Sequence, residues 1–127
     1  MAVEGPQIVW SFTPGGTIVA YTFVKLSAAN TVVACSGTTD KPIGVAQQAG
    51  ASGGAAVPVC LAGITKIEGD ADLSVGDSIG TSADAQAAAY TASDTTKHIV
   101  GIVLIDNAAA GGVVTAAINC MNSRTLA

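Results

Sequence analysis

Charge is scarce in this chain of 127 residues, which has five Lys and Arg against nine Asp and Glu and a formal net charge of −4. The basic residues are also scattered along the sequence: Lys25, Lys41, Lys66, Lys97 and Arg124. A protein that binds nucleic acid needs clustered Lys and Arg side chains to neutralise phosphates. The composition therefore predicts no nucleic-acid partner.

Aromatic residues are scarce too, at 4% of the chain, and 24 alanines fill much of its apolar half. Buried alanine removes little apolar area from water, so such a core stabilises a lone monomer only modestly. Charged residues make up 11% of the chain, whereas the surface of an ordinary soluble monomer is roughly 25–35% charged. We therefore expect neighbouring subunits to cover part of the surface.

Long apolar runs are missing. The longest, residues 99–105, has seven residues and includes a glycine, far fewer than the ~20 needed to cross a bilayer as a helix. The amino terminus lacks the basic start and the apolar stretch of an export signal. We expect no membrane partner and a protein that is made in the cytosol.

Cysteine offers no recognisable metal or redox motif. Cys35, Cys60 and Cys120 are an odd number of cysteines, and none of them stands in CxxC or CxxH spacing. This pattern favours small buried hydrophobic side chains over the alternative, a zinc site.

Catalytic groups are nearly absent as well. Gly76-Asp77-Ser78-Ile79 resembles the nucleophile block of GDSL hydrolases, in which the serine needs a histidine base oriented by a carboxylate. The single histidine, His98, lacks the Asp-x-x-His pattern of that family. We therefore predict that the chain is not an enzyme and that His98 is an edge or interface residue.

Four carboxylates fall within ten residues: Glu68, Asp70, Asp72 and Asp77. An EF-hand loop starting at Asp70 would need Gly at its sixth place and Glu at its twelfth, where this chain has Val75 and Thr81. The pattern favours a solvated acidic turn, with an irregular calcium site as the alternative. No phosphate-binding loop of the Walker type occurs. We predict neither a metal nor a cofactor.

Short segments rich in β-branched and aromatic residues dominate the rest, separated by Gly and Pro turns. They predict strands at residues 7–12, 17–25, 31–35, 43–47, 55–61, 64–68, 77–80, 99–105 and 113–119, with a hairpin over the first 25 residues. Residues 85–89 and 106–110 predict either one helical turn or an extended connection. The expected fold is all-β: a small antiparallel β-sandwich or barrel with short hairpins and at most one short helical turn.

Two stretches of the chain look like copies of one hairpin: Ile43-Gly44-Val45-Ala46 with Gly53-Gly54 and Val57-Pro58-Val59, and Val100-Gly101-Ile102-Val103 with Gly111-Gly112 and Val113-Val114. The distance from the first glycine to the Gly-Gly pair differs by one residue, as an insertion in one loop would give. Two copies are too few for a solenoid. We expect two hairpins of one closed β domain at residues 17–120, with an N-terminal arm or first strand at 1–16 and a C-terminal tail at 121–127.

An ordered set of short motifs extends over about residues 40–120: Lys41-Pro42-Ile43-Gly44-Val45-Ala46, Gly53-Gly54, Val57-Pro58-Val59, Gly63-Ile64-Thr65, Val75-Gly76-Asp77, Val100-Gly101-Ile102-Val103 and Ala110-Gly111-Gly112-Val113. The set resembles the capsid cement, or head decoration, proteins of tailed bacteriophages. That family usually has Gly-Glu before the second strand of each hairpin, where this chain has Gly54-Ala55 and Gly112-Val113. The resemblance implies a structural protein of the virion that binds the major capsid protein on the outside of the head, commonly as a homotrimer.

The ends of the chain hold the predicted interface residues. If the N-terminal segment is extended, Ile8, Trp10 and Phe12 share one face, and with Pro6 they form the predicted contact with the capsid or with another subunit. The alternative is that this face packs on the protein's own core. Arg124 and Leu126 in the tail are the second candidate, with a disordered tail as the alternative.

Two other function classes stay open. Another self-assembling virion component, such as a tail or shell subunit, would share this composition but form extended polymers by itself. A small-molecule or sugar-binding β module would need aromatic platforms around a cleft, and the chain has one Trp and two Tyr.

Overall fold

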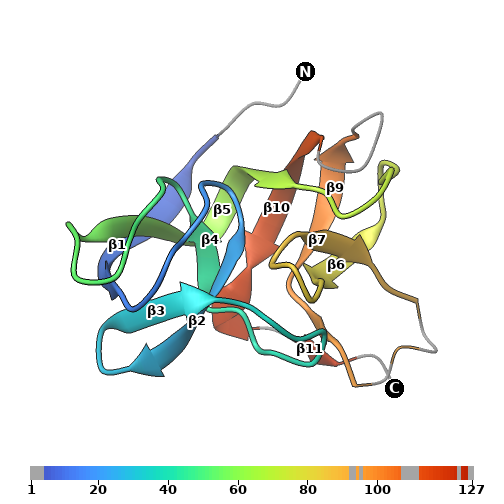
Figure 1. The fold of residues 1–127 in the computed structure, drawn as a ribbon. Helices are drawn as coiled ribbons and strands as arrows, with labels where there is room; N and C mark the ends of the chain where they lie inside the picture. The colour runs from blue at the N-terminus through green and yellow to red at the C-terminus, as the bar shows by residue number, and fades with distance from the viewer. Residues whose placement is uncertain (1–4, 92–93, 95, 107–111, 123, 126–127) are drawn as a thin grey trace.

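The computed structural model describes residues 5–91, 94, 96–106, 112–122 and 124–125. These residues form strands and one 3-10 helix, which confirms the predicted all-β class (Figure 1). In chain order the elements are β1 (Gln7–Pro14), β2 (Phe23–Ala28), β3 (Thr31–Ala34), β4 (Gly44–Ala46), β5 (Val57–Glu68), β6 (Ser78–Thr81), β7 (Ala87–Ala89), β8 (His98–Ile99), β9 (Gly101–Ile105), β10 (Val113–Asn119), η1 (Cys120–Asn122) and β11 (Arg124–Thr125).

The N-terminal half closes into a ring of five strands in the order β1-β3-β2-β4-β5. The ring closes because β1 pairs antiparallel with β5 along residues 7–12 and then meets β3 in parallel at Thr13 and Pro14. Apart from that parallel contact, the pairs of this ring are antiparallel. Strand β1 is therefore one wall of the ring.

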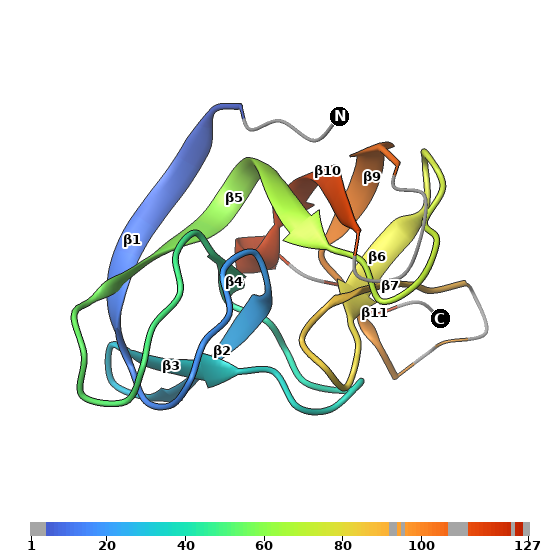
Figure 2. The ribbon, with the colours of Figure 1, turned by 45° about the horizontal axis from the view of Figure 1, so that its top comes forward.

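The C-terminal half continues the same sheet in the order β5-β10-β9-β6-β7. A parallel bridge joins Ala87 of β7 to Gly69, directly after β5. It brings β7, the last strand in this order, back beside the end of β5. The 12-residue strand β5 thus belongs to both halves and runs through the middle of the molecule (Figure 2).

The two halves repeat one arrangement of four strands. The hairpin β2–β3 is followed by the hairpin β4–β5, and β2 pairs with β4; in the same way β6–β7 is followed by β9–β10, and β6 pairs with β9. Val45 lies opposite Cys60, and Ile102 lies opposite Ala117, so both partners shift by 57 residues (45 to 102 and 60 to 117). The predicted repeat of two hairpins is confirmed, and it extends to four strands with no change of register.

A glycine occupies the same place in both hairpins. A Cβ atom on Gly44 would collide with the carbonyl oxygen of Cys60, and a Cβ atom on Gly101 would collide with that of Ala117. Glycine at these positions therefore lets the two strands of each hairpin approach closely.

Strands β2, β4 and β5 separate two hydrophobic cores. Neighbouring residues on them face opposite cores, as in the pairs Phe23 and Val24, Val45 and Ala46, and Val59 and Cys60. At these positions the strands are buried on both faces, which is why two apolar residues stand next to each other there instead of alternating with polar ones.

The predicted strand at residues 17–25 forms only in its last part. Strand β2 begins at Phe23, while Ile18 makes a single bridge with Gly50 and Tyr21 has a φ of 62°. A positive φ at a non-glycine residue interrupts an extended chain. The predicted N-terminal hairpin is therefore wrong, because β1 pairs with β5 and β3 and not with β2.

Three smaller differences concern strand ends and helical turns. The two strands predicted at 55–61 and 64–68 are the single strand β5, which passes through Gly63 at a φ of 128°. Of the two alternatives predicted for residues 85–89, the extended one is observed, since Ala87–Ala89 forms β7. The 3-10 turn at Cys120–Asn122 lies at neither predicted place, and residues 107–110 of the second place lie outside the described residues.

All three cysteines are free and buried, as the sequence predicts. Burial raises the pKa of Cys35 to about 12 and raises the pKa of Cys120 further, because a thiolate would lose its hydration there. In the described part of the chain no helix is long and apolar enough to span a membrane.

Candidate docking surface

Three consecutive apolar side chains of β1 are open to solvent. Ile8 is 55% exposed, Val9 44% and Trp10 60%, and we call these three residues the β1 patch. Side chains alternate along a strand, so Ile8 and Trp10 lie on one face of β1 and Val9 on the other. Exposed large apolar side chains on neighbouring residues indicate a contact with another molecule more strongly than a single one does. The β1 patch is therefore the candidate docking surface.

The Trp10 side chain is held in place by a residue from another strand pair. Its indole Nε1–H donates a 2.9 Å hydrogen bond to Oδ1 of Asn30, in the turn between β2 and β3. The backbone carbonyl of Asn30 accepts a second bond, from the amide of Thr13. A fixed tryptophan loses little conformational entropy on binding, which suits an anchor residue.

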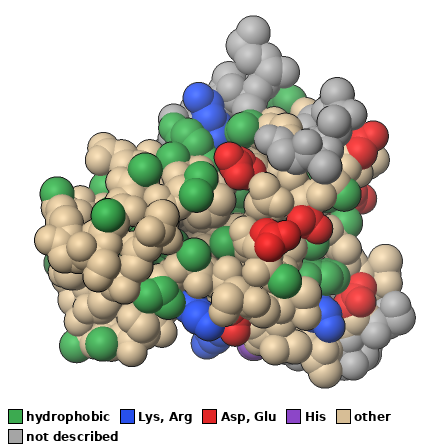
Figure 3. Space-filling view, in the orientation of Figure 1, with side chains coloured by type: hydrophobic (Ala, Val, Ile, Leu, Met, Phe, Trp, Pro, Cys, Tyr) green, Lys and Arg blue, Asp and Glu red, His purple; other side chains and the backbone are tan. Residues whose placement is uncertain are grey.

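The surface around the β1 patch carries almost no charge. Between Gly5 and Ile64 the charged residues are Lys25, Asp40 and Lys41, and the first two form a 2.9 Å ion pair with each other. In Figure 3 the half with β1 and β3 shows hydrophobic and uncharged polar side chains, while acidic side chains lie over the other half. The first ring is thus suited to contact a largely uncharged surface.

The predicted N-terminal interface residues divide between surface and core. Pro6 is exposed and lines, with Ile8, a small hollow of about 200 Å³ beside Gly63. Phe12 is 7% exposed and packs in the core of the first ring, so its prediction as an interface residue is corrected. The reason is that the ring closes around this side chain, which belongs to one buried cluster with Val32 of β3 and Val57 of β5.

The C-terminal candidates are described only in part. The backbone of Arg124 lies in β11, opposite Ile99 of β8. Leu126 lies outside the described residues. Their predicted interface role stays a prediction.

Two residues of the docking surface were not found from the sequence. Val9 lies on the opposite face of the strand from Ile8 and Trp10, yet it is also exposed. Asn30 could not be found because a hydrogen bond across 20 residues leaves no local pattern.

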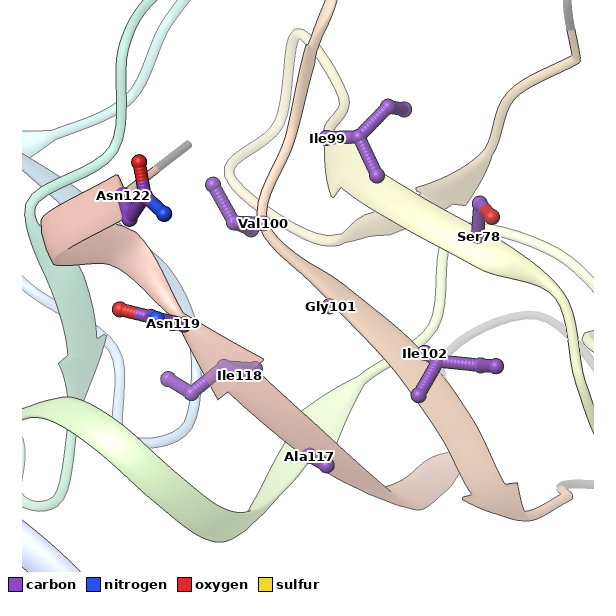
Figure 4. A pocket seen from close by; sticks show the side chains of 9 residues that line it. All are labelled: Ser78, Ile99, Val100, Gly101, Ile102, Ala117, Ile118, Asn119 and Asn122. Atoms are coloured by element: carbon purple, nitrogen blue, oxygen red, sulfur yellow. The ribbon is translucent and has the colours of Figure 1, made fainter. Parts of the chain in front are cut away.

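A hollow of about 320 Å³ lies on the second half, across β6, β9 and β10 (Figure 4). Its floor is apolar and includes Ile102 and Ala117, and its polar side chains are Ser78, Asn119 and Asn122. Ser78 belongs to the block that resembles a hydrolase nucleophile, but His98 is not among the lining residues. The hollow therefore does not bring the two candidate catalytic residues together.

Two carboxylates of the acidic segment at residues 68–77 accept hydrogen bonds from other groups of the chain. A carboxylate oxygen of Asp77 accepts a 2.9 Å hydrogen bond from the amide of Ser74, and Glu68 accepts one of 3.3 Å from the Gln86 side chain. Among the described residues, no group of three or more His, Cys, Asp or Glu side chains is placed to hold a metal ion.

Comparison with known proteins adds the last observation. No protein-family model matches the sequence, and no curated protein matches it. A solved structure does match: the head fiber gp8.5 N base in bacteriophage phi29, with a TM-score of 0.70 and 18% sequence identity over 91% of this chain and 96% of that chain. The two chains share a fold.

The alignment with the phi29 head fiber base is almost complete on both sides. It therefore includes most of both four-strand units rather than a single hairpin or one half. The closed arrangement around β5 is the fold that the two chains have in common.

Proposed function

We propose that this chain is a structural protein of a bacteriophage head, which it joins on the outer surface of the shell. The fold likeness to the head fiber base of phi29 over nearly the whole of both chains carries the proposal. The β1 patch, on an almost uncharged half of the molecule, supports it, because such a surface suits a protein–protein contact. The role needs no catalysis, no metal and no cofactor.

The more specific proposal is a capsid cement, or decoration, protein that binds the major capsid protein and stabilises the shell. Pro6, Ile8 and Trp10 would contact the shell, with Trp10 as the anchor. The homotrimer that the resemblance to this family implies stays a prediction for the protein bound to the head, to be measured from the number of copies bound at each site.

A base that holds a head fibre is the second candidate. The matching structure is described as the N base of a head fiber, which favours this alternative. The two candidates differ in one measurable property. A cement protein raises the temperature at which filled heads release their DNA when it is added alone, whereas a fibre base leaves that temperature unchanged.

Binding to heads tests the proposal directly. Purified chain is mixed with emptied heads of the phage that encodes it, the heads are pelleted, and the bound copies are counted at increasing concentration. Trp10→Ala should weaken binding about 30-fold, since losing an interface anchor costs ~2 kcal/mol. Val75→Ala is the matched control, because Val75 is 64% exposed but lies outside the β1 patch.

Point substitutions are preferable to deletion of the first strand. Because β1 is a wall of the first ring and Phe12 is part of its core, removing residues 1–12 would open the ring itself. Parent protein that does not pellet with heads would overturn the proposal. Equal binding by the parent and by Trp10→Ala would overturn only the assignment of the β1 patch.

A further inference from the structure

Strand β1 has a second edge that faces solvent. One edge pairs with β5 along residues 7–12, and the other meets β3 only from Thr13 onward. In the part of the chain that the structure describes, no strand pairs with this second edge before Thr13. An open edge of this kind is a template for another extended chain.

The backbone groups on the open edge belong to Val9 and Ser11. Ser11 lies opposite Pro58, whose carbonyl oxygen accepts a bond from Gln47 on the far side of β5, so the two residues form a non-hydrogen-bonded pair. The amide of Thr13 likewise donates away from β5, to Asn30. Because alternate residues present their N–H and C=O groups to the same edge, Val9 and Ser11 present theirs to solvent.

This edge lacks one usual protection against pairing, a charged side chain. Natural edge strands carry a charge, an internal proline or a covering segment, yet no charged residue occurs between Gly5 and Val24. The residues on and beside the edge are exposed, including 60% of Trp10. A segment of this composition meets no like-charge repulsion when it pairs with itself, although each chain carries a net charge of −4.

We propose that the open edge of β1 pairs with β1 of a second copy, antiparallel about a two-fold axis at Trp10. In this register Val9 faces Ser11 of the other copy, so that the N–H and C=O groups of both residues find partners. The two Trp10 side chains become a directly opposed, non-hydrogen-bonded pair, in which side chains lie closest. Pairing stops where β3 already meets Thr13, so the dimer is held by a short contact and dissociates on dilution.

The proposal concerns the free protein and does not rest on binding to a phage head. Both Trp10 side chains would lie on the same face of the joined strands, because a directly opposed pair shares one face. The dimer would therefore present the apolar surface of two copies side by side.

Ser11→Pro tests the backbone contact, with Ser11→Ala as its matched control. Proline removes one N–H from the open edge but none from the β1–β5 ladder, a position at which edge strands tolerate it. Sedimentation should give a dilution-dependent dimer for the parent and for Ser11→Ala, and the mass of one chain, 12.4 kDa, for Ser11→Pro. A parent that is monomeric at all concentrations, or a trimer with a mass that Ser11→Pro leaves unchanged, would overturn the proposal.

Charge substitution at Trp10 gives a second test that leaves the backbone unaltered. Trp10→Lys and Trp10→Glu should each be monomeric, because each places like charges opposite one another across the axis. An equimolar mixture of the two should recover the dimer. Recovery requires that residue 10 of one copy lies opposite residue 10 of the other copy. A mixture that stays monomeric therefore contradicts the proposed register, and this test does not depend on whether Ser11→Pro folds.

Discussion

The indole N–H of Trp10 donates a 2.9 Å hydrogen bond to the side-chain oxygen of Asn30, which links the first strand to the turn between β2 and β3. Asn30 has a φ of 52°, a conformation that asparagine tolerates better than most residues. One residue therefore both forms the turn and orients the exposed tryptophan.

Replacement of Asn30 should separate these two roles. Asn30→Ala loses the hydrogen bond and places alanine in a left-handed conformation, so the free energy of unfolding should fall by about 2 kcal/mol. Asn30→Gly loses only the bond and should cost about half as much. Asn30→Asp keeps an acceptor oxygen and serves as the control. Chemical denaturation followed by the fluorescence of Trp10, the single tryptophan, measures all three, and equal losses for Ala and Gly would contradict the argument.

The paired glycines predict a matched pair of stability effects. Gly44→Ala and Gly101→Ala each drive a Cβ atom into a carbonyl of the adjoining strand, and each should destabilise the protein by about 1–3 kcal/mol. At Gly16 an added Cβ meets nothing within 4 Å, so Gly16→Ala is the control and should be neutral or stabilising by up to ~1 kcal/mol. Thermal unfolding compares the three variants. Wild-type stability of either hairpin variant would show that the strands can separate without cost.

The buried thiols predict a loss of stability in alkali. The pKa of Cys35 is raised to about 12 from its ordinary 9.0, and that of Cys120 is also raised, because burial disfavours the thiolate. The folded chain therefore holds these protons more tightly than the unfolded chain. Stability is fully present below pH 9 and should fall as the pH rises from 9 toward 12.

Cys35→Ala should flatten this dependence on pH, although the cavity that it leaves lowers stability at every pH. A thiol reagent at pH 8 should label no cysteine of the folded protein and all three after denaturation. Rapid labelling of the folded chain would contradict the buried positions.

The Asp40 carboxylate predicts a loss of stability in acid. It accepts hydrogen bonds from Lys25 Nζ (2.9 Å) and from the amides of Ser36 (2.8 Å) and Gly37 (3.0 Å), and these bonds lower its pKa below the ordinary 3.8. Its contribution is present above pH 3.8 and is lost as the pH falls through the lowered pKa. Asp40→Asn should therefore cost about 1 kcal/mol at pH 7, and this difference from the parent should shrink as the pH falls below 3.8. A difference that stays constant as the pH falls would assign the effect to shape rather than charge.

The sequence predicted strands well where residues form β-branched or aromatic runs, because that preference is local. It failed at Tyr21, where a positive φ interrupts the predicted strand, so that only its part from Phe23 onward forms. It also could not predict the closure of the first ring, since the pairing of Gln7 with Gly63 joins segments that share no local signal.

For the candidate docking surface too, the sequence predicted the local features and missed those that depend on distant strands. Alternation along β1 placed Ile8, Trp10 and Phe12 on one face, but it could not show that the closed ring buries Phe12 in its core and leaves the other two exposed. The open edge at Val9 and Ser11 depends on which strands lie beside β1. That arrangement is a property of the whole sheet and not of the segment.

The closure of the first ring has a consequence for synthesis on the ribosome. Strand β1 emerges before its main partner, which begins at Val57 and ends its pairing with β1 at Gly63, 56 positions after Gln7. At ~5–20 residues per second, roughly three to eleven seconds pass before that partner exists. During this interval an uncharged apolar segment leaves the ribosome with both edges unpaired, so the nascent chain should need a chaperone at its first strand and should aggregate when translation pauses before residue 57.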